Sequence, residues 1–523
     1  MNIIKKTAVF FLAAIICLTG ISIPHDKKIK TQAYYPDEDC EQYLPIHGGE
    51  AFGNYPPVTW TLDTDHTLYI NSNQEECYIP NEFFSDVYIY SEDPEENYSF
   101  EIYPSYLVEK IVFYDNIDDV FLAASAFQCF FNLKSVKFPD SAGSIFIGDQ
   151  SFRDTKISSL SISAETVEIS NSAFASCTEL EDVYINAGNS CIISTSAFRE
   201  CKKLEKVYLQ NADISNKVFW QCDSLKEINL SGACKLNRYS VIDCPDLENI
   251  NTEMENTEFD NTFADCPSLK TINNTPVTDT LTGDIDPEYR DMVFGSLTAC
   301  YNVGFLTSYV KAQVKKTVEE NINGDMTGAQ KAKALHDWLC RKLSYNTRRN
   351  LPAAVDHSDE TAFLNDYTQC EGYTRAYNLL LNQAGIPTCY VHSSNHAWNI
   401  AKIDGHFFHI DTTWDDRNDG ISYDWFMKSD SELRSKGGDH AEWDLKYPSD
   451  MHSFQLKELP ECPNPVGDVN LDEKFGIADL VVMNRYIVGD EKIASDDLVL
   501  ADMDLDGRVD SFDLCLMRQE LLK

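Results

Sequence analysis

The stretch Ser172-Ala173-Phe174-Ala175-Ser176-Cys177-Thr178-Glu179-Leu180 places Phe, Cys and Leu three residues apart. Short apolar pairs follow it, beginning with Val183 and Ile185. The Phe position returns every 21 to 25 residues, at Phe127, Phe152, Phe174, Phe198, Phe219, Val241 and Phe263. A period in the range of about 20–29 residues predicts a solenoid with one short strand per turn. We therefore expect the Phe, Cys and Leu side chains of each turn to point inward and stack on those of the next.

Cysteine occupies the same place in five of these units: Cys177, Cys201, Cys222, Cys244 and Cys266. Thr155 replaces it in the second unit. Cysteines of exported proteins usually form disulfides, but one per turn at an inward position indicates buried thiols. Disulfides between adjacent stacked cysteines remain an alternative, because neighbouring strands lie within bridging distance.

The repeat pattern resembles the leucine-rich repeats of bacterial surface antigens and covers about residues 111–280. Residues 34–110 are acidic and aromatic, with alternating runs such as Val58–Leu62, and we expect them to form a β-rich N-terminal cap. A solenoid of this kind implies a recognition or spacer surface, not a reaction. A ligand on the repeat solenoid is thus one expected partner.

The first 33 residues predict a secretory signal peptide. Lys5 and Lys6 precede an uncharged apolar run over residues 7–23, and Thr31-Gln32-Ala33 offers a cleavage site. A membrane anchor is the alternative, but Pro24 ends the run early. No later segment is apolar enough to span a bilayer, so we expect no membrane span after cleavage.

The formal net charge of the chain is −41. The signal region holds five Lys and one Asp, so its removal leaves −45. Such a charge repels nucleic acid and anionic lipid, so we expect neither as a partner. The same acidity suits an exported protein that binds cations.

Beyond about residue 281 the apolar period becomes helical, with helices expected over 305–320 and 327–344. Gln369-Cys370-Glu371-Gly372-Tyr373 then opens another apolar-periodic segment, which runs to Leu381 and stops at Gly385. Cys370 is therefore predicted at a helix N-terminus. The unpaired N–H groups and positive dipole end there favour a thiolate, the reactive form of cysteine.

A β-hairpin is predicted around Asp404-Gly405, between the runs beginning at His396 and His406. If these two residues form the turn, the residue numbers of each cross-strand pair add up to 809, so that Asp411 faces Trp398. His396 is then the diagonal neighbour of Asp411 on the same face of the sheet. Diagonal neighbours lie roughly 7–8 Å apart, close enough for a carboxylate to hold an imidazole. Together with Cys370 this predicts the activated nucleophile of acyl transfer. His406 and His409 lie near the turn, and we expect them at the surface.

The blocks Gln-Cys370-Glu-Gly-Tyr, His396-Ala-Trp-Asn and Asp411-Thr-Thr-Trp-Asp resemble those of the transglutaminase-like superfamily, a papain-related α+β fold. The resemblance covers about residues 281–455. It implies that Cys370 is the nucleophile, His396 the general base and then acid, and Asp411 the residue that orients His396. A protein or peptide substrate is implied, with hydrolysis and cross-linking both open.

Two related acidic loops follow a Pro-containing linker predicted over residues 456–466. The oxygen-bearing side chains lie at alternating positions and close with a carboxylate at position 12, as Ca²⁺ prefers. The ligands expected for two Ca²⁺ ions are Asp468, Asn470, Asp472 and Asp479 in the first loop, and Asp502, Asp504, Asp506, Asp510 and Asp513 in the second. Gly507 stands at position 6 of the second loop, whereas Glu473 stands there in the first.

The duplicated loop-helix unit over residues 467–523 resembles a type I dockerin, the module that binds cohesins of a scaffoldin. By that resemblance, contacts to cohesin come from Ile477, Ala478, Asn484 and Arg485 in the first copy and Ser511, Phe512, Arg518 and Gln519 in the second. The two copies differ at the first of these positions, which puts two-way binding in doubt.

The expected fold class is multidomain α+β. It comprises a β-rich leucine-rich repeat solenoid, a papain-like α+β transglutaminase core and an all-α paired EF-hand-like dockerin. The expected function is a thiol acyl-transfer activity. We expect the protein that carries it to be secreted, extracellular and attached to a cellulosome through a calcium-dependent cohesin contact. A non-enzymatic adhesin or assembly factor that uses the repeats is the alternative. A polysaccharide-degrading enzyme is a weaker one, because no carboxylate pair is recognisable.

Overall fold

The computed structural model describes residues 58–63, 65–72, 75–79, 89–93, 98–102, 104–128, 130–290, 301–347, 357–444, 454–456 and 458–523. The expected signal peptide, residues 1–33, lies outside them. The chain divides into two compact units, Met1–Pro276 and Val277–Lys523. No helix among the described residues is long and apolar enough to cross a membrane.

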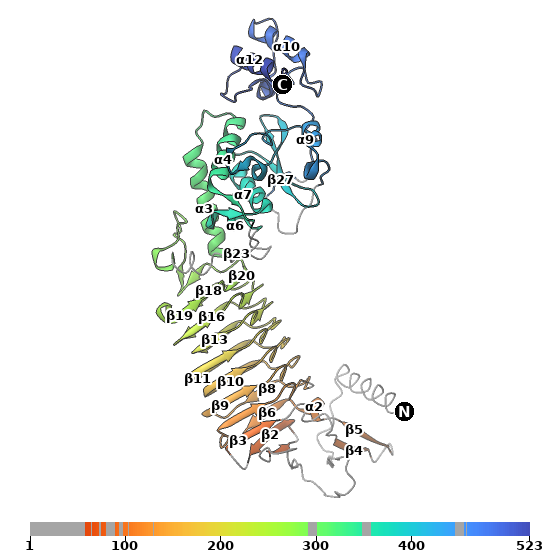
Figure 1. Cartoon of the computed structure of the whole chain (residues 1–523). Helices are drawn as coiled ribbons and strands as arrows, with labels where there is room; N and C mark the ends of the chain where they lie inside the picture. The colour runs from red at the N-terminus through yellow and green to blue at the C-terminus, as the bar shows by residue number, and fades with distance from the viewer. Residues whose placement is uncertain are drawn as a thin grey trace. The chain divides into compact units, whose positions relative to one another are not determined.

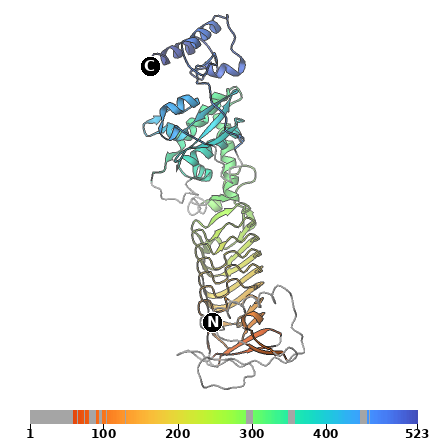
Figure 2. The same ribbon diagram turned by 90° about the vertical axis from the view of Figure 1, so that its right-hand side faces the viewer.

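A ladder of parallel strands runs through the first unit, one rung per repeat (Figures 1 and 2). Its path ends in a short antiparallel pairing of the last two strands. The path comprises β3 (Glu76–Ile79), β7 (Asp119–Leu122), β9 (Ala142–Ile147), β10 (Ser159–Ile169), β11 (Asp182–Ile193), β12 (Lys206–Gln210), β15 (Glu227–Ser231), β18 (Asn249–Asn251), β21 (Thr271–Ile272) and β22 (Thr275–Pro276). Three further strands continue from β11 along the same side: β13 (Ala212–Ile214), β16 (Cys234–Leu236) and β19 (Thr257–Phe259).

The remaining strands of this unit form smaller sheets. One has the order β1 (Val58–Leu62), β2 (Thr67–Ser72), β6 (Lys110–Phe113) and β8 (Ser135–Lys137). It begins within the expected cap and continues into the first repeats. The others are the hairpin β4 (Ile89–Asp93) with β5 (Tyr98–Ile102), and the parallel ladder β14 (Phe219–Trp220), β17 (Val241–Ile242) and β20 (Phe263–Cys266). Helix α2 (Pro104–Leu107) and the 3-10 turn η1 (Met254–Asn256) complete the unit.

Inward stacking of the repeat residues, as predicted, forms the solenoid core. Phe152, Phe174, Phe198 and Phe219 have no exposed surface, and neighbouring rings stack with centroids 5.1 to 5.7 Å apart. Stacked aromatic rings remove large apolar areas from water at every turn, and this burial holds the turns together.

The repeat cysteines are free thiols that hydrogen-bond to the preceding turn. Cys177 donates to the carbonyl oxygen of Phe152 at 3.1 Å, and Cys201 to that of Phe174 at 3.3 Å. Thr155, which replaces the cysteine in its turn, donates to the carbonyl oxygen of Phe152 at 2.8 Å. Burial raises the pKa of Cys177 to about 12, so this thiol stays protonated at neutral pH. Disulfides between stacked cysteines are therefore absent among the described turns.

The second unit begins with helices packed on a three-stranded antiparallel sheet (Figure 1). The helices are α3 (Gly304–Asn321), α4 (Gly328–Lys342), α6 (Asp359–Leu364) and α7 (Cys370–Gln383), and the sheet has the order β26 (Thr388–His392), β27 (Ala397–Ile403) and β28 (His406–Ile410). Tyr377 and Leu381 of α7 pack with Ala401 and Phe408 of the sheet, all of them buried. Thr327 caps α4 through a capping box with Gln330, which explains where this helix begins.

Short elements complete the part of this unit that contains the three-stranded sheet. They are β24 (Ser344–Tyr345), β25 (Tyr367–Thr368), α8 (Thr412–Asp415), β29 (Asp416–Arg417), β30 (Gly420–Ile421), α9 (Asp430–Lys436) and η4 (Gly438–His440). Cys462, inside the expected linker, is fully buried and packs with Cys389 and Trp398. The chain at Cys462 is thus packed against the sheet, not free between domains. The C-terminal module holds α10 (Ile477–Ile487), η5 (Ser495–Asp497), α11 (Leu498–Ala501) and α12 (Ser511–Glu520).

Candidate active site and calcium loops

Cys370 is the first residue of α7, as the sequence predicts, and its side chain is half-buried. Gly372, two residues later, has to be glycine because a Cβ atom there would lie 2.0 Å from Oγ1 of Thr368. The first turn of α7 therefore packs directly on the strand before it. This close approach fixes the position of Cys370, and the N–H groups of the first turn lack partners within the helix.

His396 and Asp411 lie together at the end of the predicted hairpin. β27 and β28 pair Ile403 with His406 and Asn399 with Ile410, so the predicted register is confirmed. Nε2 of His396 lies 2.6 Å from Oδ2 of Asp411. A carboxylate can only accept, so Nε2 carries the proton and Nδ1 is the nitrogen left for the thiol.

His396 and Asp411 each shift the pKa of the other. Burial alone would lower the pKa of His396, but the Asp411 carboxylate and then the Cys370 thiol raise it well above its usual range. Burial would likewise raise the pKa of Asp411, but His396 and His440 hold it below the usual value. The imidazole and the carboxylate thus stabilise each other's charged form.

Aromatic side chains surround His396. The ring of Trp398 lies 5.7 Å from that of His396, as does the ring of Trp414, whose side chain is 39% exposed. On the other side, Cys370 packs against a small buried cluster that contains Tyr390 and Phe454. Apolar and aromatic side chains thus border both His396 and Cys370, and the ring of Trp414 is partly exposed to solvent.

His409 does not lie at the surface, so that prediction was wrong. Its ring is fully buried, with Nδ1 accepting from Trp398 Nε1 at 3.0 Å and Nε2 lying 2.9 Å from Asp430. Position near a turn suggested exposure, but α9 folds over this face of the hairpin and covers it. His406 is also partly buried, with Nε2 2.9 Å from Asp497.

A second histidine on Asp411 was not predicted. Nε2 of His440 lies 2.7 Å from Oδ2 of Asp411, the oxygen that His396 also contacts. His440 comes 29 residues after Asp411 and is brought back by α9 and the turn at Gly437 and Gly438, whose φ angles are +69° and +61°. No local motif in the sequence places His440 beside Asp411.

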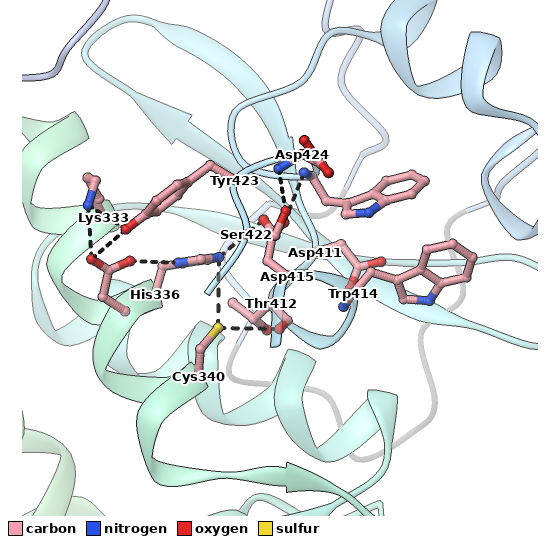
Figure 3. Close-up of polar contacts among 12 residues, drawn as sticks. Lys333, His336, Cys340, Asp411, Thr412, Trp414, Asp415, Ser422, Tyr423 and Asp424 are labelled. Atoms are coloured by element: carbon pink, nitrogen blue, oxygen red, sulfur yellow. Dashed lines mark hydrogen bonds and ion pairs between the residues drawn. The ribbon is translucent and has the colours of Figure 1, made fainter. Parts of the chain in front are cut away.

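Another buried cluster lies behind this site, centred on His336 of α4 (Figure 3). Its Nδ1 lies 3.0 Å from Asp337 and its Nε2 3.3 Å from Asp415, the last residue of α8. Burial lowers the pKa of His336, but the two carboxylates raise it well above the usual range. Cys340 completes the cluster, donating to the carbonyl oxygen of Thr412 at 3.4 Å. The cluster ties α4 to the short helix that begins beside Asp411.

The two acidic loops have the same internal hydrogen bonds. Asp468 accepts from the backbone N–H of residues 472 and 473 at 3.1 and 2.9 Å, and Asp502 accepts from those of residues 506 and 507 at the same distances. Glu473 and Gly507, at position 6, both have positive φ, at +67° and +85°. The first loop therefore has the turn of the second despite lacking glycine there.

The carboxylates of the second loop converge. One oxygen each from Asp502, Asp504 and Asp506 lies within 4.8 Å of the others. Asp479 and Asp513, the position-12 residues, are buried and accept from the N–H groups of Gly476 and Asp510, each at 2.8 Å. Oxygen atoms gathered in this way fit Ca²⁺, which takes six to eight oxygen ligands at about 2.3–2.6 Å.

The side chains expected to contact cohesin are all exposed. Ile477 is 76% exposed and Phe512 57% exposed, which is unusual for such large apolar side chains. The others are Ala478, Asn484, Arg485, Ser511, Arg518 and Gln519. An apolar residue left in water at the start of each helix suits a contact with another protein.

Family models match three parts of the chain. Residues 96–222 and 187–282 match the BspA type leucine rich repeat region in six copies, residues 315–412 the transglutaminase-like superfamily, and residues 466–522 the dockerin type I domain. The chain combines these three families. The transglutaminase-like match includes Cys370, His396 and Asp411 and ends before His440. Type I dockerins bind calcium, and the dockerin implies a cohesin partner and extracellular, cellulosome-type attachment.

Two solved leucine-rich repeat structures are similar to part of the chain. The T. pallidum leucine rich repeat protein is 15% identical, covers 37% of this chain and 90% of its own, and has a TM-score of 0.23. A leucine rich cell surface protein from Faecalibacterium prausnitzii is 13% identical, covers 46% and 95%, and has a TM-score of 0.20. No curated protein matches the chain significantly.

Proposed function

We propose that the transglutaminase-like part is a thiol acyl-transfer enzyme that acts on an amide or peptide carbonyl. The observation that carries the proposal is the contact of 2.6 Å between His396 and Asp411, with Cys370 at the N-terminus of α7 beside them. An imidazole that a carboxylate holds next to a thiol in the first turn of a helix is the arrangement that activates a nucleophile.

In the proposed reaction the Cys370 thiolate attacks the carbonyl carbon of the substrate. The carbon–nitrogen bond then breaks, and His396 gives its proton to the leaving ammonia or amine. A thioester remains on Cys370. Water or a second amine attacks it, the proton of that nucleophile passes to His396, and the thiolate leaves. The N–H of Cys370 is placed to stabilise the oxyanion by its position in the first turn of α7.

Hydrolysis and cross-linking share every step except the last. The difference depends on whether water or an amine reaches the thioester. Trp414, which is partly exposed beside His396, stands where either would enter. We therefore define the activity as acyl transfer and leave the acceptor to experiment.

The dockerin is proposed to hold this activity on a scaffold. Two Ca²⁺ ions would each be bound by one loop, and a cohesin of a scaffoldin would cover the exposed starts of α10 and α12. We propose that the protein is secreted, in keeping with this attachment and with its strong negative charge. The solenoid supplies a recognition or spacer surface for the substrate.

Thiol labelling of the full chain near neutral pH tests the proposed nucleophile. Cys370 should react with iodoacetamide faster than Cys515, an exposed thiol on α12 that serves as the internal control. His396→Ala should remove the difference and leave Cys515 unchanged. Peptide mapping by mass spectrometry measures both rates. If Cys370 reacts no faster than Cys515 in the wild-type protein, the proposed activity is wrong.

The acceptor is identified by incubating the protein with a peptide library and a labelled amine. Mass spectrometry then separates three products: a cleaved peptide, a deamidated glutamine, and an amine joined to the peptide. Cys370→Ser, which keeps the shape of the side chain, is the control. Product that persists in this variant would arise from some other source.

A non-enzymatic adhesin is the second candidate, and one feature of the solenoid favours it. Tyr78, Phe121 and Phe146 form a stacked row across β3, β7 and β9, with ring centroids 5.2 and 4.3 Å apart. Phe121 remains 41% exposed. If labelling shows an ordinary Cys370, binding through the repeats becomes the better account of the protein.

A further inference from the structure

His440 offers a role that neither the sequence motifs nor the family match assigns. Its ring has no exposed surface, and its Nε2 lies 2.7 Å from Oδ2 of Asp411. Asp411 therefore has two imidazoles on one oxygen, because Nε2 of His396 lies 2.6 Å from the same atom. We propose that His440 is a positioning residue that fixes the Asp411 carboxylate and thereby the orientation of His396. The inference rests on the proposed function.

His440 completes the hydrogen bonding of the Asp411 carboxylate. Oδ1 of Asp411 accepts from the backbone N–H groups of Thr413 and Trp414 at 3.0 and 3.1 Å. Oδ2 accepts from His396 and His440. A carboxylate offers about four lone-pair directions, so these four donors occupy all of them. Without His440, Oδ2 would be held only by the imidazole that it has to orient.

The contacts of the two ring nitrogens of His440 show which of them carries the proton. A carboxylate accepts only, so Nε2 of His440 carries the hydrogen in this contact. Nδ1 is buried and has no hydrogen-bond partner. A proton on Nδ1 would leave a buried donor unpaired, which is unfavourable. Nε2 is therefore the nitrogen through which His440 donates to Asp411.

Aromatic rings fix the orientation of His440. Trp425 stacks on its ring at 4.2 Å, while Trp414 meets it edge-on at 4.8 Å and Trp398 lies at 4.7 Å. These rings leave Nε2 directed at Asp411. Side chains that pack a ring on several sides while one polar atom contacts the triad are expected of a residue that positions another.

The test compares two amide variants in the full chain. His440→Gln can place its NH₂ group where Nε2 lies, whereas His440→Asn is too short to reach Asp411. Both leave a polar group in the same cavity, so they should disturb packing to a similar degree. The readout is the rate of Cys370 alkylation from pH 4 to pH 10, with Cys515 as internal control and His396, Asp411 and His409 as the titratable groups around His440.

His440→Asn should slow Cys370 alkylation at neutral pH by about 10-fold to 100-fold, as loss of an orienting partner commonly does. The acid side of its profile should also move to higher pH, because Asp411 loses a donor that stabilises its charge. His440→Gln should stay within about threefold of the wild type with the wild-type profile, since it restores that one donor.

The alkylation profiles of the two variants and of the wild type separate the role of His440 from the proposed function. Equal profiles for the two variants would overturn the role of His440, whether both match the wild type or both are slow. In that case a fast wild-type Cys370 would leave the proposed function standing. If wild-type Cys370 is no more reactive than Cys515, the proposed function fails and the role of His440 fails with it.

Discussion

Replacing His336 by Leu measures how much the buried cluster behind the candidate active site contributes to the free energy of unfolding. The imidazole is fully buried between two carboxylates, and the side chain of Asp415 is fully buried as well. Leu has a similar volume, so little cavity is expected. The variant leaves Asp415 as a buried carboxylate without its ionic partner. Asp337 keeps Lys333 and Tyr423, at 2.9 and 3.0 Å, and should be affected little.

The expected loss follows from what remains around Asp415. Removing one partner of a buried ion pair costs about 3–5 kcal/mol in the free energy of unfolding. Asp415 keeps one donor, the backbone N–H of Trp425 at 3.1 Å, so we expect the lower end. The melting temperature of a unit of this size falls by roughly 2–4 °C per kcal/mol, so about 3 kcal/mol corresponds to roughly 6–12 °C.

Tryptophan fluorescence measures this loss selectively, since five of the seven tryptophans lie in Val277–Lys523. Arg341→Gln, on the same helix but with a side chain 66% exposed, is the matched control and should stay within about 0.5 kcal/mol of the wild type. Adding Asp415→Asn to His336→Leu should recover part of the loss, because the uncompensated charge is gone. A melting temperature unchanged in His336→Leu would refute the reasoning.

The pH dependence gives a second check. Burial raises the pKa of Asp415 even with His336 present, and the loss of the imidazole raises it further. A carboxyl group with a raised folded pKa destabilises the fold increasingly as pH rises from its unfolded pKa to its folded pKa. The cost of His336→Leu should therefore grow between about pH 4 and pH 6, where His336 is charged in both the folded and the unfolded wild-type chain and its own contribution is constant. An equal cost at both pH values would contradict the ionic explanation.

Three further outcomes follow from the site, the loops and the solenoid. Asp411→Asn should slow the alkylation of Cys370 at least about tenfold at neutral pH. An unchanged rate would show that another group orients His396. Asp468→Ala combined with Asp502→Ala should abolish capture by an immobilised cohesin, as should a calcium chelator. Asp490→Ala, an exposed carboxylate outside the loops, should bind normally. Phe198→Ala should cost about 3–5 kcal/mol in urea unfolding followed by circular dichroism, and a loss below 1 kcal/mol would contradict the stacked core.

Local sequence patterns determined much of this fold. Spacing alone placed the buried Phe and Cys positions of the solenoid, because each turn repeats one short unit. Helix signals placed Cys370 at the first residue of α7, and the Asp404-Gly405 turn fixed the register that brings His396 to Asp411. These predictions succeeded because each depends on neighbours within a few residues.

The environment of Asp411 was only partly predictable. His440 reaches it through a chain segment whose path depends on packing against the tryptophans, and no spacing rule connects the two residues. His336 carried a weak signal, since it lies on the apolar face of α4 with Leu335 and Leu339. The burial of His409 was missed because exposure depends on which later segment covers a strand.

The buried cysteines of the repeats allow the local opening of the solenoid to be measured at single turns. Each of Cys201, Cys244 and Cys266 is completely buried, and burial raises the pKa of each well above its usual range. A small alkylating reagent can modify such a group only after its own turn has opened. Rates of modification along the row would therefore report the opening free energy turn by turn. They would show whether fraying starts at one end or throughout.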